Sequence, residues 1–575
     1  MNRKKFALIL LLAGMSVLCV LFVRIDERNA VFCIGKFDRL AIRVRTNTYE
    51  EVINPWYKEE EDTWYFFLPS GMNDKAIYND EQEIPVLLDG RELAPFERFE
   101  WEEGREYRMV YDNIHGHNDL RVKFRASSEI PAVFIETESK VMRYLDESVY
   151  NTVYHTEKGT ITVYEANGGV SYRGTLSIRG RGNSTWYSFD KRPYNIKLDK
   201  AGSLLGMERD RDWCLLANAW DYSYMNNKLA FDMASKAGFR YVPDAEYADV
   251  YFNGDYWGIY LITETVEVGE SRISITNLRE KNEKANPDTD LTDEDTIESI
   301  YFDNGNQRGI KLENIPADIT GGYLLERDFR AIRTEKYPVK KPSFFETSGY
   351  GTAINIKSPK FADLREVEYI SALTSEMEQA IRSENGYSES GKYYLDYIDL
   401  ESWVRCYMIG EIAHDPDKDV TNTYYYKDRD SIDSRFYSGP VWDYDMRFGG
   451  KEEQSSPEVL TRLATGGWRN TGGWSQYLYE KPEFYSEVCR EWNRFFKGYL
   501  QNEMPGKTRE WQEQIRKSVE MDLIRWPRGK GYSKKWPAEG EQFTDVYSYD
   551  DQAEYLRTWL TKRCEFLDGY WGDGQ

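Results

Sequence analysis

The chain has 575 residues, 41% of them hydrophobic and 30% charged, which is the balance of a folded protein with about two to four domains. Its formal net charge is -23 at pH 7, and a charge of this sign disfavours nucleic acid as a partner, because phosphate backbones bind basic surfaces. Carboxylates attract cations, so the same charge does not exclude an anionic ligand that carries a divalent metal ion.

The cysteines and histidines exclude two further classes of protein. The 6 cysteines are scattered without a CxxC pair, and an odd number of them follows the first apolar segment, so a disulfide framework is not indicated and buried free thiols are expected. With only 4 histidines and no HExxH motif, the sequence also argues against a zinc enzyme.

A membrane segment is predicted at the start of the chain. Three basic residues, Arg3, Lys4 and Lys5, precede an uncharged run over 6–23, which is near the lower length limit for a helix that spans a bilayer. The basic flank would stay in the cytoplasm and place the main body outside it. No small-residue cleavage site follows the run, so residues 1–28 are predicted to be a retained single-pass anchor. A cleaved signal peptide, with a secreted or coat-bound product, is the alternative.

Residues 29–126 predict a small β-sandwich-like module. Short runs in which apolar and polar residues alternate, such as 40–44 and 120–124, are separated by turn signals. The simplest role for such a module is a spacer that holds the following domain away from the membrane.

A second β-rich region is predicted over about 127–275. A turn rich in Gly and Arg covers 179–186, and a strand carrying Lys197 follows it. The lysines beside that strand, Lys191 and Lys200, are expected to be solvated. A helix is predicted from 224 to 237, where Gly238 ends it, and Asn253-Gly254 is a strong hairpin signal.

The rest of the chain is predicted to be mainly helical. The polar, acidic stretch 279–319 is expected to be a mobile insertion or linker. Helices are predicted over 363–383 and 399–413, and a helical tail rich in Trp and Tyr over about 474–571.

Two acidic motifs carry the clearest chemical signal. Asp417 is followed by Asn422, and Asp443 and Asp445 come after a short intervening stretch. This is the spacing of a protein-kinase active site, where the first Asp orients the hydroxyl and the Asn and the later Asp hold metal ions on ATP. On a strand, Asp443 and Asp445 would face the same side. The simpler alternatives are a capped loop for the first motif and a salt bridge to Arg447 for the second.

Candidate phosphate contacts come from the β-rich region. The turn that contains Arg181 and Ser184 can present guanidinium groups and backbone N–H groups to phosphate oxygens. Lys197 lies on a strand after a Gly-rich turn, as a kinase lysine does. Glu264 could pair with Lys197, face the nucleotide, or be a structural acid. The alternatives are a hairpin whose arginines pair with acids elsewhere, and a surface lysine.

With these motifs, about 130–500 of the sequence resembles the CotH kinase family, atypical kinases first associated with a spore-coat protein. Seven motifs agree with the family in order and spacing: Arg181–Trp186, Lys191–Lys197, Leu204–Met207, Trp213–Asn218, Asn253–Tyr260, Pro416–Asn422 and Gly439–Asp445. Two positions depart from it. Asn226-Asn227 stands where the family often has Arg-Asn, and Asp415 stands where Asn is common.

The resemblance implies an α+β, divergent bilobal protein-kinase-like fold over 127–500, with an N-lobe over about 127–275, a C-lobe over about 320–500 and a helical extension over 501–575. It implies ATP with Mg²⁺ or Mn²⁺ as cofactors. By the resemblance Asp417 is the catalytic residue, Asn422, Asp443 and Asp445 hold the metal, and Lys197 holds the phosphates. Arg181, Ser184 and Glu264 are the further candidates for nucleotide contacts.

Three functions follow as hypotheses. The first is a kinase that phosphorylates Ser or Thr of surface or spore-coat proteins. The second is a non-catalytic adhesion or coat-assembly protein, which the scarcity of ATP outside cells favours and the complete acidic set opposes. The third is carbohydrate binding by exposed aromatic and acidic residues, for which the spacing gives no specific support.

Overall fold

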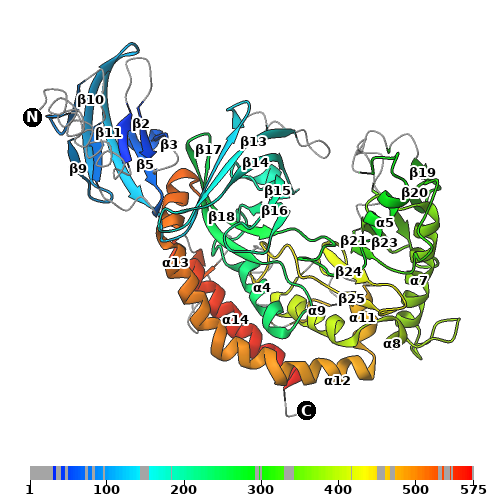
Figure 1. Cartoon of the computed structure of the whole chain (residues 1–575). Helices are drawn as coiled ribbons and strands as arrows, with labels where there is room; N and C mark the ends of the chain where they lie inside the picture. Colours follow the sequence, from blue (N-terminus) through cyan, green and yellow to red (C-terminus); the bar gives the residue numbers. More distant parts are fainter. Residues whose placement is uncertain are drawn as a thin grey trace, which may run out of the picture.

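The computed structural model describes residues 30–33, 40–45, 50–70, 76–79, 85–94, 97–142, 145, 155–182, 184–291, 297, 301–328, 342–415, 417–449, 460, 462–465, 473–528, 534–535, 544–545 and 548–572. Figure 1 shows an N-terminal β-module, a β-barrel beside it, a second sheet with its helices, and two long C-terminal helices that run back beneath the barrel.

The N-terminal module consists of two sheets. Phe66 and Phe124, both fully buried, stack in its core. Its strands are, in sheet order, β3 (Glu50–Ile53), β2 (Ala41–Arg45), β1 (Ala30–Cys33), β6 (Ala76–Asn79) and β9 (Arg98–Glu100), and then β4 (Trp56–Lys58), β5 (Thr63–Leu68), β11 (Gly116–Ala126), β10 (Glu106–Asn113), β7 (Val86–Leu88) and β8 (Arg91–Leu93). The module packs on the barrel, where the Tyr251 hydroxyl donates to the Phe67 carbonyl at 3.1 Å.

The barrel closes in the order β12 (Ala132–Thr137), β13 (Thr156–Tyr164), β14 (Val170–Gly180), β15 (Tyr194–Gly202), β16 (Asp210–Leu216), β18 (Asp255–Glu264) and β17 (Ala245–Phe252). Alternate residues such as Ile196, Leu198 and Trp213 fill its interior. The predicted hairpin is confirmed, since Asn253 and Gly254 join β17 to β18 with φ of 52° and 86°.

The second sheet follows the order β19 (Tyr301–Asp303), β20 (Gln307–Ile310), β22 (Phe344–Glu346), β23 (Ala353–Ser358), β21 (Tyr323–Arg327), β24 (Thr423–Lys427) and β25 (Phe436–Ser438). The predicted helices are confirmed as α7 (Leu364–Arg382), which begins with a capping box at Asp363, and α9 (Leu400–Ala413), which Asp399 caps. Part of the predicted acidic insertion is regular structure, because it contains α5 (Leu278–Ala285), β19 and β20.

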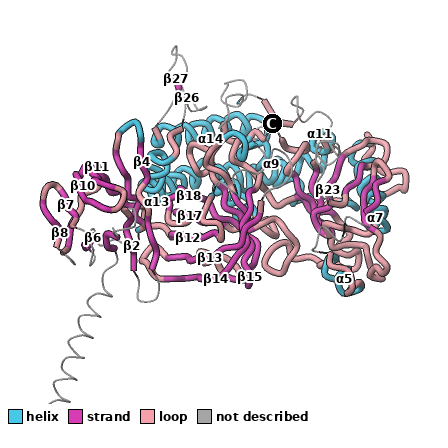
Figure 2. The backbone as a smooth tube through the Cα atoms, turned by 90° about the horizontal axis from the view of Figure 1, so that it is seen from above, coloured by secondary structure: helices cyan, strands magenta, loops and turns pink. Residues whose placement is uncertain are grey.

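The helical tail is also confirmed. It contains α11 (Trp474–Tyr479), α12 (Pro482–Glu491), α13 (Met504–Arg525) and α14 (Tyr549–Trp571). In Figure 2, α13 and α14 lie along one side of the barrel strands, and α14 continues toward α9. The helix predicted from 224 is α4 (Asn226–Ala237), and Gly238 ends it in the left-handed region. These helices share one large hydrophobic core with the outer face of the barrel and the second sheet.

A buried carboxylate fixes α13 to the barrel. Asp522 is fully buried and forms an ion pair with Lys191 at 2.7 Å. It also accepts hydrogen bonds from the Tyr224 hydroxyl at 2.7 Å and from the Ile259 N–H at 3.1 Å. The expectation that Lys191 is solvated is therefore wrong, because this lysine lies in the interface and neutralises a carboxylate that would be costly to bury alone.

The predicted fold and location need a correction at the N-terminus. No helix within the part of the chain that the structure describes is long and apolar enough to cross a bilayer. Residues 1–28, where the anchor was predicted, lie outside the described residues. The transmembrane anchor and the single-pass membrane localisation are therefore not supported. In place of a simple bilobal arrangement, the structure has a closed barrel and a second sheet that the C-terminal helices join.

The predicted thiols can be examined where the chain is described. Cys214, Cys406 and Cys564 form no disulfide, and Cys214 and Cys564 are buried. Cys214 and Cys564 thus agree with the expected buried free thiols, whereas Cys406 is only partly buried.

Asp249 makes the interface between α13 and the barrel sensitive to pH. Burial raises its pKa to about 6, although the hydroxyls of Ser518 and Tyr256 donate to it. The folded state therefore retains a proton that the unfolded chain releases, so the free energy of unfolding falls as pH rises from 4 to 6. We expect Asp249→Asn to remove a pH-dependent loss on the order of 3 kcal/mol, measured by urea unfolding across this range. The exposed control Asp112→Asn should show the same dependence of the free energy of unfolding on pH as the unchanged protein. If Asp249→Asn and Asp112→Asn show the same dependence on pH, Asp249 is not its source.

Candidate active site

The first acidic motif follows the end of α9. His414 ends that helix with a left-handed φ of 49°, and the chain then turns, so that the N–H groups of Val420 and Thr421 donate to the Asp417 carbonyl at 2.9 and 3.0 Å. Asn422 also has a positive φ, 55°. Asn is among the residues that tolerate this conformation best. The turn brings Asp417 and Asn422 to one side of the loop that leads into β24.

The second acidic motif lies on a loop rather than on a strand. Asp443 has a φ of 68°, outside the extended region, and neither Asp443 nor Asp445 lies in a strand, so the expected alternation on a strand is wrong. The start of α4 holds this loop in place. Asn227 accepts from the Tyr444 N–H at 2.8 Å, and the Asn226 amide donates to the carbonyls of Asp445 and Arg447 at 3.3 and 3.0 Å.

The two motifs meet through their side chains. The Asn422 amide donates to the Asp443 carboxylate at 2.6 Å. Arg447 donates to Asp417 at 3.1 Å and also forms an ion pair with Asp415. Arg447 thus binds the carboxylates of the first motif. The simpler alternative from the sequence was a salt bridge between Arg447 and the second motif. Residues from two distant segments therefore form one acidic cluster around a buried arginine.

The turn after β14 brings the barrel to this cluster. The Arg181 guanidinium carbon lies 5.6 Å from the centre of the Trp442 ring. On the short helix α3 (Ser184–Ser188), the Thr185 hydroxyl donates to Asp445 at 3.4 Å, and the Ser184 hydroxyl lies 4.0 Å from the Met446 sulfur. The structure thus places the predicted Arg181 and Ser184 next to the second acidic motif.

The charges of this cluster act strongly on one another. Burial raises the pKa of Asp445 to about 7, and repulsion from Asp443 adds to that effect. Burial alone would lower the pKa of Arg181, but Cys214 and then Asp443 are the main groups that raise it above its usual value. The pKa of Arg447 is raised as well, since Asp415 and Asp417 outweigh the effect of its burial. The site therefore concentrates negative charge that a cation would relieve.

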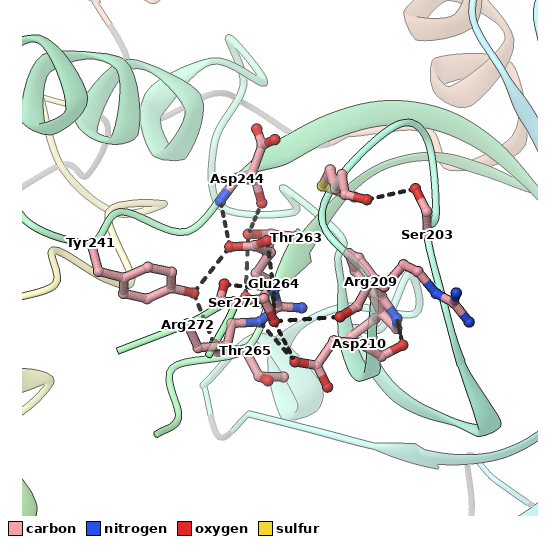
Figure 3. Close-up of polar contacts among 12 residues, drawn as sticks. Ser203, Arg209, Asp210, Tyr241, Asp244, Thr263, Glu264, Thr265, Ser271 and Arg272 are labelled. Carbon is pink, nitrogen blue, oxygen red and sulfur yellow. Dashed lines mark hydrogen bonds and ion pairs between the residues drawn. The ribbon is translucent and has the colours of Figure 1, made fainter. Parts of the chain in front are cut away.

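Lys197 and Glu264 lie in a different network, on the barrel. Lys197 is about half exposed and pairs with Asp212 at 3.4 Å. Glu264 is buried, pairs with Arg272 at 2.7 Å and accepts from the Asp244 N–H and the Tyr241 hydroxyl, each at 3.1 Å (Figure 3). These contacts favour the structural role for Glu264. The predicted nucleotide contacts of Lys197 and Glu264 stay predictions.

A second acidic group lies in this barrel network. One carboxylate oxygen from each of Asp210, Asp212 and Glu267 lies within 4.8 Å of the others. Burial raises the pKa of Glu267 to about 7. Lys197 and Arg272 already supply positive charge here, since Lys197 pairs with Asp212 and the Arg272 Nε lies 3.7 Å from Asp210. Both acidic groups therefore have cationic neighbours, Lys197 and Arg272 on the barrel and Arg181 and Arg447 at the first cluster.

The donor atoms of the first cluster fit Mg²⁺ or Mn²⁺. Asp443 and Asp445 supply half-buried carboxylates, and the Asn422 amide nitrogen is turned to Asp443, which leaves its carbonyl oxygen as a further hard ligand. Such oxygen donors are the ones these ions prefer.

Sequence reasoning did not find every residue of the site. Thr185 lies beside the predicted Ser184, but its contact with Asp445 depends on the fold and could not be predicted from the sequence. Asn226 and Asn227 had been noted only as a departure from the family pattern, and their role in holding the Asp445 loop could not be read from it. The Arg447 contacts with Asp415 and Asp417 likewise join segments that the sequence separates.

The family model described as CotH kinase protein matches residues 178–567, which is more than half of the chain. The chain therefore belongs to the CotH kinase family, and the resemblance seen in its motifs is confirmed. The matched range includes the barrel strands from the end of β14, both acidic motifs, α13 and most of α14. A search of curated proteins finds no match.

Arg447 is expected to be the main source of stability within the acidic cluster. Arg447→Met would leave Asp415 and Asp417 together without their cation, so the free energy of unfolding should fall by about 3–5 kcal/mol. Arg447→Lys should lose less, because it keeps the charge. Urea unfolding near pH 7 measures both.

The matched control is Arg108→Met, which breaks an exposed ion pair with Asp119 and should cost no more than about 1 kcal/mol. If the two Met variants lose equal stability, Arg447 does not hold the cluster together.

Proposed function

We propose that the protein is a kinase that uses ATP and a divalent metal ion to phosphorylate Ser or Thr hydroxyls of a protein. One observation carries the proposal. Asp417, Asn422, Asp443 and Asp445 come from two distant segments and form a single cluster that faces Arg181 and Thr185 of the barrel. Membership of the CotH kinase family supports the same activity.

Each group has a role that its position supports. Asp417 takes the proton of the acceptor hydroxyl as the hydroxyl oxygen bonds to the γ-phosphorus and the bond to the bridging oxygen breaks. Arg447 keeps the Asp417 carboxylate in place through the contact at 3.1 Å. Arg181 and the turn that carries Ser184 and Thr185 bind phosphate oxygens from the barrel side.

The metal ligands in this proposal are Asn422, Asp443 and Asp445. A Mg²⁺ or Mn²⁺ ion bound there supplies positive charge to the transferring phosphates. Asn226 and Asn227 hold the backbone of this loop, so the carboxylates keep their position while the charge on the phosphates changes.

A labelling assay tests the proposal. The unchanged protein and the Asp443→Asn variant are each incubated with Mn²⁺, ATP labelled at the γ-phosphate and a Ser-rich acceptor protein. We expect metal-dependent label on the acceptor, and a loss of at least about 100-fold in Asp443→Asn and in Asp417→Asn, because each removes a group that acts on the reacting atoms. Asp112→Asn, in the N-terminal module, should keep full activity.

The other outcomes separate the alternatives. Label from the α-phosphate would replace phosphoryl transfer by nucleotidyl transfer. No label, together with no rise in melting temperature with Mn²⁺ and ATP, would contradict the kinase and favour a coat-assembly protein without catalysis. Equal activity in Asp443→Asn and Asp112→Asn would remove the metal role from Asp443.

A further inference from the structure

One face of α14 contacts the chain just before the first acidic motif and just after the second. Tyr555, Trp559 and Arg563 recur at every fourth residue of this helix and therefore lie on the same face. All three are buried, and the Arg563 side chain is fully buried. In Figure 1, α14 runs beside α13, beneath α4 and α9.

Arg563 binds the end of the helix that leads into the first motif. Its Nε and Nη2 atoms donate to the Glu411 carbonyl at 2.9 and 2.7 Å. This carbonyl belongs to the last turn of α9 and also accepts from the His414 N–H at 3.1 Å, so Arg563 adds a charged donor at a helix end where the dipole favours a cation. Arg563 therefore fixes the point from which the Asp417 loop starts.

Tyr555 and Trp559 bind the end of the second motif. The Tyr555 hydroxyl donates to the Gly449 carbonyl at 3.1 Å. Gly449 has a φ of 75°, and a Cβ atom there would lie 2.4 Å from the Trp559 ring, so only glycine allows this close approach. The Trp559 ring also meets Phe448 edge to face, with ring centres 6.2 Å apart.

A backbone bond joins the two attachment points. The Phe448 N–H donates to the Ala413 carbonyl at 3.0 Å, so the end of α9 and the end of the second loop are in direct contact. The distance between the two acidic motifs is therefore set by Arg563 on one side of this contact and by Tyr555 on the other.

We propose that Tyr555 and Arg563 are positioning residues that fix the Asp417 loop and the Asp443–Asp445 loop relative to each other. Neither residue belongs to the proposed metal ligands or phosphate contacts, and both act on backbone carbonyls that flank them. The inference rests on the proposed function for its effect on catalysis, but its effect on the two loops can be measured without any activity.

The test uses the whole chain with Tyr555→Phe, which removes one hydroxyl. Its matched control is Tyr485→Phe, because the Tyr485 hydroxyl also donates to a carbonyl, that of Tyr570 at the far end of α14, at 3.0 Å. Amide hydrogen exchange is followed in both variants. We expect the Tyr444 and Arg447 amides to exchange at least about tenfold faster in Tyr555→Phe than in the unchanged protein, and no change in Tyr485→Phe.

Kinase assays on the same samples add the catalytic consequence. We expect kcat to fall about tenfold in Tyr555→Phe while KM for the acceptor protein stays constant, since the loops and not the acceptor surface have moved. Arg563→Lys should retain part of the activity that Arg563→Met loses.

Unchanged exchange at Tyr444 and Arg447 in Tyr555→Phe, or equal acceleration in Tyr485→Phe, would overturn the proposal. If the unchanged protein transfers no label, the proposed function fails, and hydrogen exchange still decides whether α14 positions the loops.

Discussion

The buried carboxylate of Asp522 is the contact on which the arrangement of the molecule depends. It takes an ion pair from Lys191 of the barrel side and a hydrogen bond from Tyr224, just before α4. A Cβ atom on Gly258 would lie 2.1 Å from it, so the β18 backbone can approach only because that residue is glycine. A buried charge of this kind is stable only when it is fully paired. It therefore fixes α13, the barrel and the start of α4 in one geometry.

That geometry reaches the acidic cluster through α4. Asn226 and Asn227 begin the helix next to Tyr224, and their amides hold the loop of Asp443 and Asp445. The Asp221 carboxylate accepts the Asn226 N–H at 2.7 Å and so anchors the same turn. The site is thus assembled from three directions: the turn after β14, the start of α4, and the loops that α9 and β25 lead into. The turn after β14 contributes Arg181 and Thr185, the start of α4 contributes the Asn amides, and the two loops contribute the carboxylates.

The sequence predicted those features that local chemistry determines. The Asn253-Gly254 hairpin, the end of α4 at Gly238 and the caps of α7 and α9 follow from residues close in the chain. The spacing of Asp417 and Asn422 likewise indicated a shared pocket. Contacts between distant segments were not predictable. The burial of Lys191 depends on Asp522, the partner of Lys197 is Asp212 on the next strand, and the positive φ of Asp443 reflects how α4 holds its loop.

The proposed role of α14 has a consequence for the order in which the site is assembled. A ribosome makes the chain from the N-terminus, so every carboxylate of the acidic cluster leaves the exit tunnel before Tyr555 and Arg563 do. Until then the end of α9 lacks the charged donor that binds its Glu411 carbonyl, and Gly449 lacks the Trp559 ring that it packs against. A nascent chain therefore carries the acidic residues without their final arrangement. Under the proposed function, phosphoryl transfer would therefore begin only after α14 has been synthesised and has packed against both loops.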